Sequence, residues 1–185
     1  EFEKTGCNNY VFGMEESYGC LPGTYARDKD APAAVTMLCE VAAYCKAQGK
    51  TLWDAMIDIY EKYGYYREGI ATMTLKGIDG AAQIREIMSR ARGTMPKKVG
   101  AFDVIAVRDY KADTRTDVKT GEVTKTGLPV SDVLYYELSD NAWCCVRPSG
   151  TEPKIKFYCG VKGTSLTEAD AQLEALKKEV LALFE

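Results

Sequence analysis

The chain has 185 residues and a formal net charge of −3 at neutral pH, with 24 Lys and Arg, 27 Asp and Glu, and no His. An acidic balance argues against nucleic acid or an anionic membrane as the main partner, because both attract basic surfaces. Hydrophobic residues form 46% of the sequence, and the apolar runs are far shorter than the roughly 20 residues that span a bilayer. We therefore expect a folded cytoplasmic protein of one or two domains with no membrane partner.

Cysteine and histidine usage restricts the chemistry further. The seven cysteines are an odd number and include no Cys-x-x-Cys pair, so we expect small core thiols in a reducing compartment and no metal site. The absence of His removes the commonest general base and the usual partner of a Ser or Cys nucleophile. A hydrolase of the triad type is therefore not expected.

The N-terminal third predicts one short strand followed by two helices. Tyr10–Phe12 is an apolar run that ends at Gly13, and it predicts the strand. Asp30 is expected to cap the first helix, with Pro32 in the first turn, where a missing N–H costs nothing. Gly49 is expected to end that helix.

The second helix is expected to begin at Thr51, because Asp54 three residues later completes a variant of the capping box, and to end at Gly64. Both helices carry apolar stripes that need a sheet to cover them, yet only one strand precedes them. We therefore expect residues 1–64 to be part of an α/β domain that belongs to a longer protein.

From residue 65 onward the pattern changes to strands, and it predicts an α+β domain over residues 65–185 with one layer of sheet and one of helices. The polar stretch 111–127 is expected to be an exposed excursion, with a hairpin as one form of it. The predicted order is β-α-β(4)-α, with strands at 67–76, 101–110, 133–138, 142–147 and 155–161, a helix from Asp79 to Gly93, and a final helix from Ser165 or Thr167.

The segment Arg147–Thr151 has the composition of a phosphate-binding loop between two strands. Arg offers a planar fork of donors, Ser and Thr add hydroxyl groups, and Gly lets backbone N–H groups approach an anion. Lys154 and Lys156 add positive charge just beyond it. The alternative is an ordinary polar turn of a hairpin, in which Pro, Ser, Gly and Thr are common.

A second glycine-flanked loop, Gly13–Gly19, contains Glu15, Glu16 and Ser17. These side chains can bind several hydroxyl groups of a polyol or hold a hard cation, and a solvated loop is the alternative interpretation. The segment Arg27–Asp30 alternates in charge before a predicted helix. It is typical of a capping and salt-bridge cluster, although a Lys at this place can have its pKa lowered by the helix dipole.

The segments FGMEESYGCLPGTYARDKDA and CVRPSGTEPKIKFY, about 130 residues apart, resemble the α-D-phosphohexomutase superfamily, and specifically its phosphoglucomutase/phosphomannomutase members. The resemblance implies that residues 1–64 are the end of the third domain of that family. It also implies that residues 65–185 are the fourth domain, with a fold like that of the TATA-box-binding protein. The sequence of the first loop, which includes Tyr18, more closely resembles the members of the family that act on glucose phosphates.

The resemblance also implies roles for individual residues. In the family, the third-domain loop binds sugar hydroxyls, the fourth-domain loop binds the phosphate that is not transferred, and a Lys lies near the active site. The corresponding residues are Glu15 and Ser17 for the sugar hydroxyls, Arg147, Ser149, Gly150, Thr151 and Lys156 for the phosphate, and Lys29 as a catalytic residue.

The implied reaction interconverts hexose 1-phosphate and hexose 6-phosphate through a phosphoserine and a bisphosphate intermediate, with Mg²⁺ and glucose 1,6-bisphosphate as cofactors. This sequence matches neither the phosphoserine loop nor the metal loop. We therefore expect a C-terminal fragment that is inactive alone, whose partners are a hexose phosphate and the missing N-terminal domains. The alternatives are a stand-alone phosphosugar-binding or interaction module, and an amino-sugar phosphate mutase or phosphopentomutase.

Overall fold

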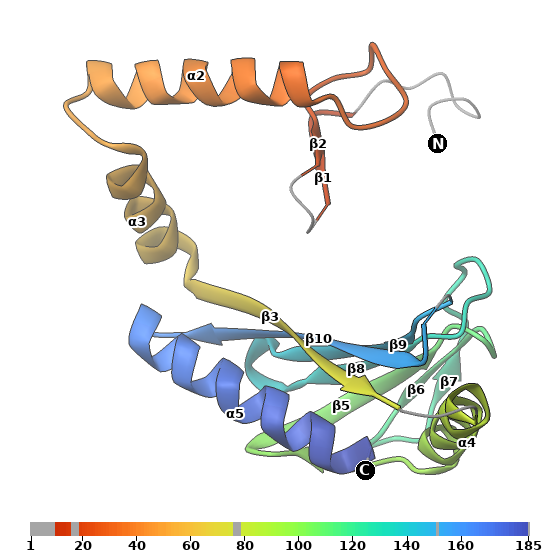
Figure 1. Cartoon of the computed structure of the whole chain (residues 1–185). Coiled ribbons are helices and arrows are strands. Elements are labelled where there is room, and N and C mark those ends of the chain that lie inside the picture. Colours follow the sequence, from red (N-terminus) through yellow and green to blue (C-terminus); the bar gives the residue numbers. More distant parts are fainter. Residues whose placement is uncertain (1–9, 16–18, 76–78, 151, 185) are drawn as a thin grey trace. The chain divides into compact units, whose positions relative to one another are not determined.

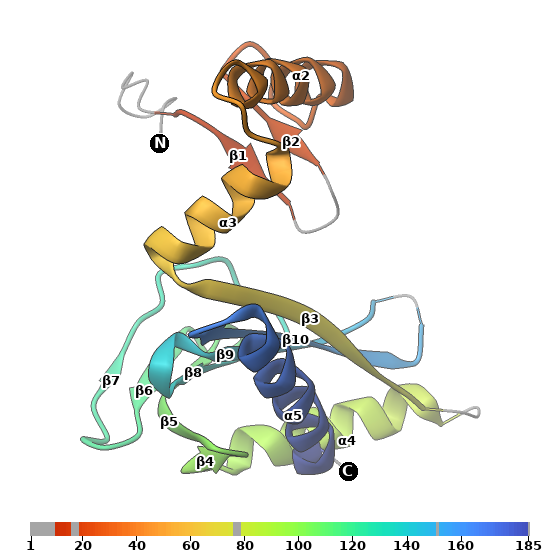
Figure 2. The same cartoon turned by 90° about the vertical axis from the view of Figure 1, so that its left-hand side faces the viewer.

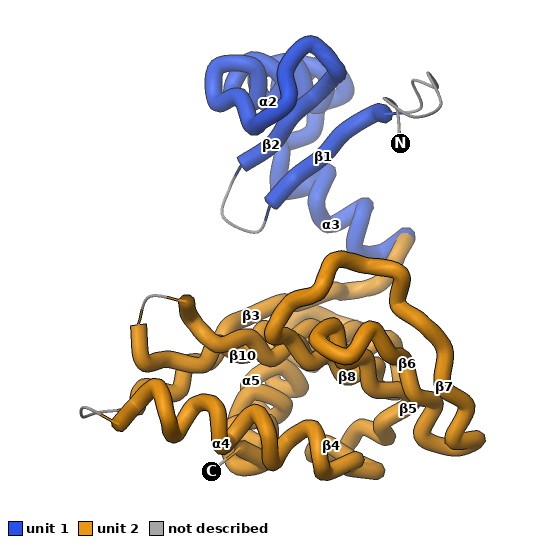
Figure 3. The backbone as a smooth tube through the Cα atoms, turned by 90° about the vertical axis from the view of Figure 1, so that its right-hand side faces the viewer, with its two compact units in different colours: residues 1–62 blue, residues 63–185 orange. Residues whose placement is uncertain are grey.

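The computed structural model describes residues 10–15, 19–75, 79–150 and 152–184. The chain divides into two compact units, residues 1–62 and residues 63–185, which are described separately here (Figure 3). The boundary expected from the sequence lies after residue 64, two residues later than this division. Within the described ranges, no helix has the length and apolarity needed to cross a membrane.

The first unit contains a short antiparallel ladder. Strands β1 (Gly13–Met14) and β2 (Cys20–Leu21) pair with Gly13 opposite Leu21. The strand predicted at Tyr10–Phe12 is wrong in position, since those residues precede β1 and are exposed. The Tyr10 hydroxyl donates to the Leu21 carbonyl at 2.8 Å. A side-chain hydrogen bond, and not strand pairing, therefore connects this apolar run to the ladder.

The two predicted helices are present, and their N-terminal signals act as predicted. Helix α2 (Ala31–Ala47) begins after Asp30, whose side chain accepts a hydrogen bond from the Ala33 N–H at 3.1 Å. Helix α3 (Leu52–Tyr63) begins after Thr51. The Thr51 N–H donates to the Asp54 carboxylate at 2.8 Å, and the Asp54 N–H donates to the Thr51 hydroxyl at 3.1 Å, which completes a capping box.

Most of the apolar side chains of α2 and α3 are exposed. Val35 and Leu38 of α2, and Met56 and Ile59 of α3, each expose more than two fifths of their surface. Cys45 alone is buried among the residues of these two helices. The described part of this unit therefore presents apolar helix faces without a sheet that covers them.

The second unit is an antiparallel sheet with two helices. Its strands pair in the order β3-β10-β9-β8-β5-β6-β7, with β4 beside β5. Helices α4 (Gly80–Gly93) and α5 (Leu166–Phe184) lie on the same face of this sheet (Figures 1 and 2). The strands are β3 (Tyr65–Thr74), β4 (Lys98–Val99), β5 (Phe102–Asp109), β6 (Thr114–Asp117), β7 (Val123–Thr124), β8 (Leu134–Leu138), β9 (Trp143–Pro148) and β10 (Lys154–Gly163).

This arrangement confirms the predicted α+β class and contains the predicted β-α-β(4)-α order in β3, α4, β5, β8, β9, β10 and α5. The excursion at 111–127 contains the β6–β7 hairpin, one of the forms expected for it. Asp79 stands at the predicted start of α4, but its side chain makes no capping hydrogen bond. Its backbone carbonyl accepts from the N–H groups of Ala82 and Gln83 instead.

The core lies between the sheet and α5. Alternate residues of β10 are fully buried (Ile155, Phe157, Cys159 and Val161), as the alternation in the sequence predicted. They face the apolar stripe of α5, which includes Leu173, Leu176 and Val180. Each fully buried side chain of this size contributes about 1.5–3 kcal/mol, so this layer fixes which face of the sheet remains open to solvent.

Candidate functional site

The phosphate-binding residues predicted from the sequence lie at one end of the β9–β10 hairpin. Arg147 of β9 stands directly opposite Lys156 of β10, and Lys156 stands opposite Thr72 of β3. Residues directly opposite one another share a face of the sheet, and the sequence neighbours Val146 and Phe157 point into the core. The three side chains therefore form a row on the outer face, which is the face away from α4 and α5.

The two cations in this row have no carboxylate partner among the residues that the structure describes. The nearby carboxylate of Glu152 binds Lys154 instead, at 3.2 Å. Both cations are exposed. Burial raises the pKa of the adjacent Cys145 thiol to about 11, and the charge of Arg147 opposes this shift. Because like charges directly opposite each other repel, a bound anion would stabilise the pair.

The outer face also carries a second pair of opposed cations, whose charges are neutralised by a carboxylate. Arg108 and Arg115 stand opposite each other on β5 and β6, and Glu137 lies on β8, on the other side of β5. The Glu137 carboxylate accepts from Arg108 Nε at 2.6 Å and from Arg115 Nη2 at 2.7 Å. Arg147 and Lys156 have no such acid within the described ranges, so this pair is the better candidate for an anion supplied from outside.

The loop that joins β9 to β10 is tightly hydrogen-bonded. The Ser149 N–H donates to the Lys154 carbonyl at 2.8 Å, and the Ser149 hydroxyl accepts from the Glu152 N–H at 3.3 Å. A Cβ placed on Gly150 would meet no atom within 4 Å, so its backbone is open to an approaching ligand. Thr151 lies outside the described residues. The loop is thus a hairpin turn. An ordinary hairpin turn does not require two cations without a carboxylate partner among the described residues, and Arg147 and Lys156 are such a pair.

The sugar-binding residues predicted in the first unit are described in part. Glu15 follows β1, and its N–H donates to the Gly19 carbonyl at 2.8 Å. Lys29 Nζ lies 3.0 Å from Glu15 Oε1 and 2.7 Å from Asp28 Oδ1, so the structure brings together Glu15 and Lys29, which are 14 residues apart. A Cβ on Gly19 would lie 2.3 Å from the Lys29 Cδ, which explains the glycine. Ser17 and Glu16 lie outside the described residues.

The hydrogen bond from Lys29 to Asp28, and then the one to Glu15, raise the pKa of the Lys29 amine. The hypothesis that a helix dipole lowers this pKa is wrong, because the two neighbouring carboxylates favour the charged form. Lys29 is therefore a cation at neutral pH and acts as a hydrogen-bond donor rather than as a base. The salt-bridge interpretation of the Arg27–Asp30 segment is confirmed.

Thr72 is a candidate that the sequence did not reveal. Its place beside Lys156 depends on the register of β3 against β10, which pairs residues 80 to 98 positions apart. A hydroxyl group in a strand has no pattern of its own, so only the strand pairing could have found it.

The described residues do not offer a metal centre. Among them, no three His, Cys, Asp or Glu side chains converge as a set that could hold an ion.

The fold and the outer face together define the class: an α+β protein whose open sheet face carries Arg147 and Lys156 without a carboxylate partner among the described residues. Residues 2–63 match the family model for phosphoglucomutase/phosphomannomutase, alpha/beta/alpha domain III. A phosphoglucomutase of Staphylococcus epidermidis is 37% identical over 150 residues, which is 81% of this chain and 27% of that protein. A phosphoglucomutase of Staphylococcus aureus is 33% identical over 168 residues, which is 91% of this chain and 30% of that protein.

The chain belongs to the phosphoglucomutase/phosphomannomutase family of phosphohexomutases. It spans less than a third of the length of these curated relatives.

Proposed function

We propose that this chain is the part of a phosphoglucomutase/phosphomannomutase that holds the phosphosugar. The whole protein would interconvert hexose 1-phosphate and hexose 6-phosphate through a phosphoserine and a bisphosphate intermediate. The observation that carries the proposal is the directly opposed Arg147–Lys156 pair without a carboxylate among the described residues. The family of the chain supports the phosphosugar as the source of the missing anion.

In this proposal the phosphate that is not transferred binds on the outer face at the end of the β9–β10 hairpin. The guanidinium of Arg147 can donate two parallel hydrogen bonds to phosphate, and Lys156 adds a point charge. Ser149, Gly150 and Thr151 supply hydroxyl and backbone donors from the loop. The sugar must present either end to the reacting group, so the grip has to recognise a phosphate without reading the rest of the molecule.

The sugar hydroxyls are assigned to Glu15 and Ser17 in the first unit. The hydrogen bond from Lys29 orients the Glu15 carboxylate, whose oxygens can also accept hydrogen bonds from hydroxyl groups. Lys29 is proposed as a catalytic residue that contacts the substrate as a cation.

The cofactors belong to the proposal for the whole protein. Mg²⁺ would neutralise developing charge in phosphoryl transfer, and glucose 1,6-bisphosphate would serve as activator and intermediate. We assign the Mg²⁺ ligands and the phosphoserine to the missing N-terminal domains, which are the proposed partners of this chain. The cytoplasm is the proposed location, since the six described cysteines are all free thiols.

The proposal is tested by titrating the ¹⁵N-labelled chain with inorganic phosphate and with glucose 1-phosphate and mannose 1-phosphate. We expect amide shifts at Arg147, Ser149 and Lys156, and at least a tenfold loss of affinity in Arg147→Ala, because a charge-assisted contact is worth about 1.5–3 kcal/mol. Arg108→Ala is the matched control, since it removes an outer-face cation that is already neutralised. An equal loss in both variants would contradict the assignment.

Two further measurements separate the alternatives. In a coupled assay we expect no mutase turnover from this chain and no effect of Mg²⁺ on its phosphate affinity, so turnover would overturn the division of roles. The gene sequence upstream of Glu1 distinguishes a mutase from a stand-alone binding module, because the mutase requires a phosphoserine loop there. Tighter binding of an amino-sugar or pentose phosphate would identify a different substrate within the same chemistry.

A further inference from the structure

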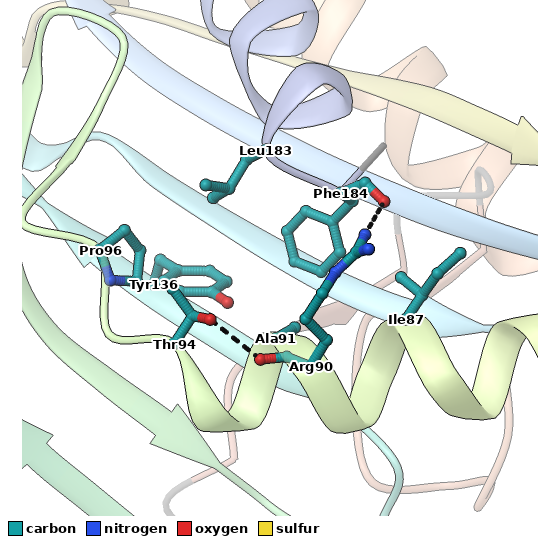
Figure 4. A pocket seen from close by; sticks show the side chains of 8 residues that line it. All are labelled: Ile87, Arg90, Ala91, Thr94, Pro96, Tyr136, Leu183 and Phe184. Carbon is teal, nitrogen blue, oxygen red and sulfur yellow. Dashed lines mark hydrogen bonds between the residues drawn. The ribbon is translucent and has the colours of Figure 1, made fainter.

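The second unit contains a cavity of about 210 Å³ between α4, α5 and the inner face of the sheet (Figure 4). It lies on the opposite face of the sheet from Arg147 and Lys156, so it is separate from the phosphate site. Apolar cavities of about 150 Å³ are large enough to take up benzene. The cavity is walled by the apolar side chains of Ile87, Ala91, Pro96, Leu183 and Phe184.

Arg90 brings a positive charge to this cavity. One of its Nη groups donates to the Phe184 carbonyl at 3.0 Å, which holds the guanidinium beside the cavity. The ion pairs among the residues that the structure describes do not include Arg90, whereas the nearby Arg92 pairs with Asp109 and Asp132. A guanidinium carries five N–H donors, so several are left for a ligand.

Tyr136 of β8 brings a second donor. Only 2% of this residue is exposed, and its ring packs edge-on against Phe184, with 6.4 Å between ring centroids. Its hydroxyl lines the cavity and makes no hydrogen bond to any described residue. Burial raises the pKa of this hydroxyl, which therefore stays a protonated donor at neutral pH. The hydroxyl is therefore available as a donor to an acceptor inside the cavity.

We propose that this cavity is a binding site for a small amphipathic monocarboxylic acid. Its apolar body would fill the space between α4 and α5, and its carboxylate oxygens would accept hydrogen bonds from Arg90 and Tyr136. The positive charge of Arg90 selects an anion over a neutral or cationic molecule of the same shape. The site does not rest on the proposed mutase function, and binding can be measured on the chain as it is.

Hexanoate, 1-hexanol and hexylamine are matched probes, because they share an apolar body and differ in charge. We expect saturable shifts of the Ile87 and Leu183 methyl signals with hexanoate in a ¹³C-methyl NMR titration. We also expect at least tenfold weaker binding of 1-hexanol and no binding of hexylamine. Equal affinity for the three probes, or no saturable shift of these two methyl groups, would overturn the proposal.

Four variants assign the binding to this place. Tyr136→Phe removes only an unpartnered hydroxyl, so we expect a folded chain with about tenfold weaker hexanoate binding. Arg90→Gln should reduce hexanoate to the affinity of 1-hexanol, and Arg90→Lys should keep the preference for the anion even if the Gln variant folds poorly. Ala91→Leu should abolish binding by filling the cavity.

Lys156→Gln is the control on the outer face, and we expect it to leave hexanoate affinity unchanged. A loss of affinity in this variant would place the carboxylate at the phosphate site and contradict the assignment to the cavity. Unchanged hexanoate binding in both Tyr136→Phe and Arg90→Gln, or unchanged binding in Ala91→Leu, would also contradict it.

Discussion

The carboxylate of Glu137 joins three strands of the outer face. It lies on β8 and accepts hydrogen bonds from Arg108 on β5 and Arg115 on β6. The hydrogen bond from Arg115 is the largest cause that lowers the pKa of Glu137 below its usual range, and burial opposes it. Without this carboxylate the two guanidinium groups would face each other directly.

The lowered pKa of Glu137 makes the stability of the second unit depend on pH. A carboxylate whose pKa is lower in the folded state stabilises the fold above its unfolded value of 4.5, and this contribution is lost as the pH falls through the folded value. We expect Glu137→Gln to lower the free energy of unfolding at pH 7 by about 1–2 kcal/mol and to flatten the acid limb. Urea unfolding at pH 7 and in steps below pH 5 measures both effects.

Glu174→Gln is the matched control for that experiment. Glu174 pairs with Lys177 on the exposed surface of α5, and its side chain is 72% exposed, so its removal should change stability by less than about 0.5 kcal/mol. If the two variants lose the same stability, Glu137 does not hold the outer-face cations together.

The residue types in the sequence were sufficient to predict which loop residues are candidates for binding phosphate. How these residues are arranged in space depends on the strand register. Arg147 and Lys156 could be selected because each carries a charge beside a Gly-containing turn. Nothing in the sequence says that they stand directly opposite each other, because this depends on the length of the turn that joins β9 to β10. The absence of a nearby carboxylate is likewise a property of the packed sheet.

At the scale of the elements, local hydrogen bonds decide where the helices begin. Thr51 and Asp54 exchange hydrogen bonds at the start of α3, and the sequence predicted this because the two residues are only three positions apart. The short strands β4 and β7 have two residues each, too few for any alternation to be recognised. They exist because β5 and β6 offer them a partner edge.

The capping box predicts how α3 responds to substitution. Thr51→Ala removes the hydroxyl that accepts from the Asp54 N–H, and we expect it to destabilise α3 by about 1 kcal/mol, whereas Thr51→Ser should cost little. Amide hydrogen exchange in residues 52–63 of the two variants is the measurement. Identical exchange in the Ala and Ser variants would show that the cap does not limit the stability of the helix.

At the scale of the whole molecule, the two units differ in how much apolar surface they bury. The second unit has a continuous core between the sheet and its two helices, and α2 and α3 of the first unit expose most of their apolar residues. The sequence predicted the helices correctly from periodicity. It could not show which side chains are covered, because coverage depends on parts of the fold far away along the chain.

This difference predicts unequal protection of the two units. We expect the amides of α2 and α3 to exchange at least tenfold faster than those of β10 and α5, because local opening is cheap where few apolar contacts are broken. Hydrogen exchange followed by mass spectrometry on the full chain measures it peptide by peptide. Equal protection of α2 and β10 would show that the first unit is as well packed as the second.

The placement of Arg147 and Lys156 on neighbouring strands also determines how a bound anion would move with the protein. The backbone ladder of β9 and β10, and not a free loop, holds Arg147 and Lys156 opposite each other, so the spacing of their Cα atoms is fixed by the sheet. A rigid-body movement of this sheet would carry both residues together and keep them on either side of a bound anion. The affinity for the anion and the mobility of the sheet can therefore be changed by separate substitutions.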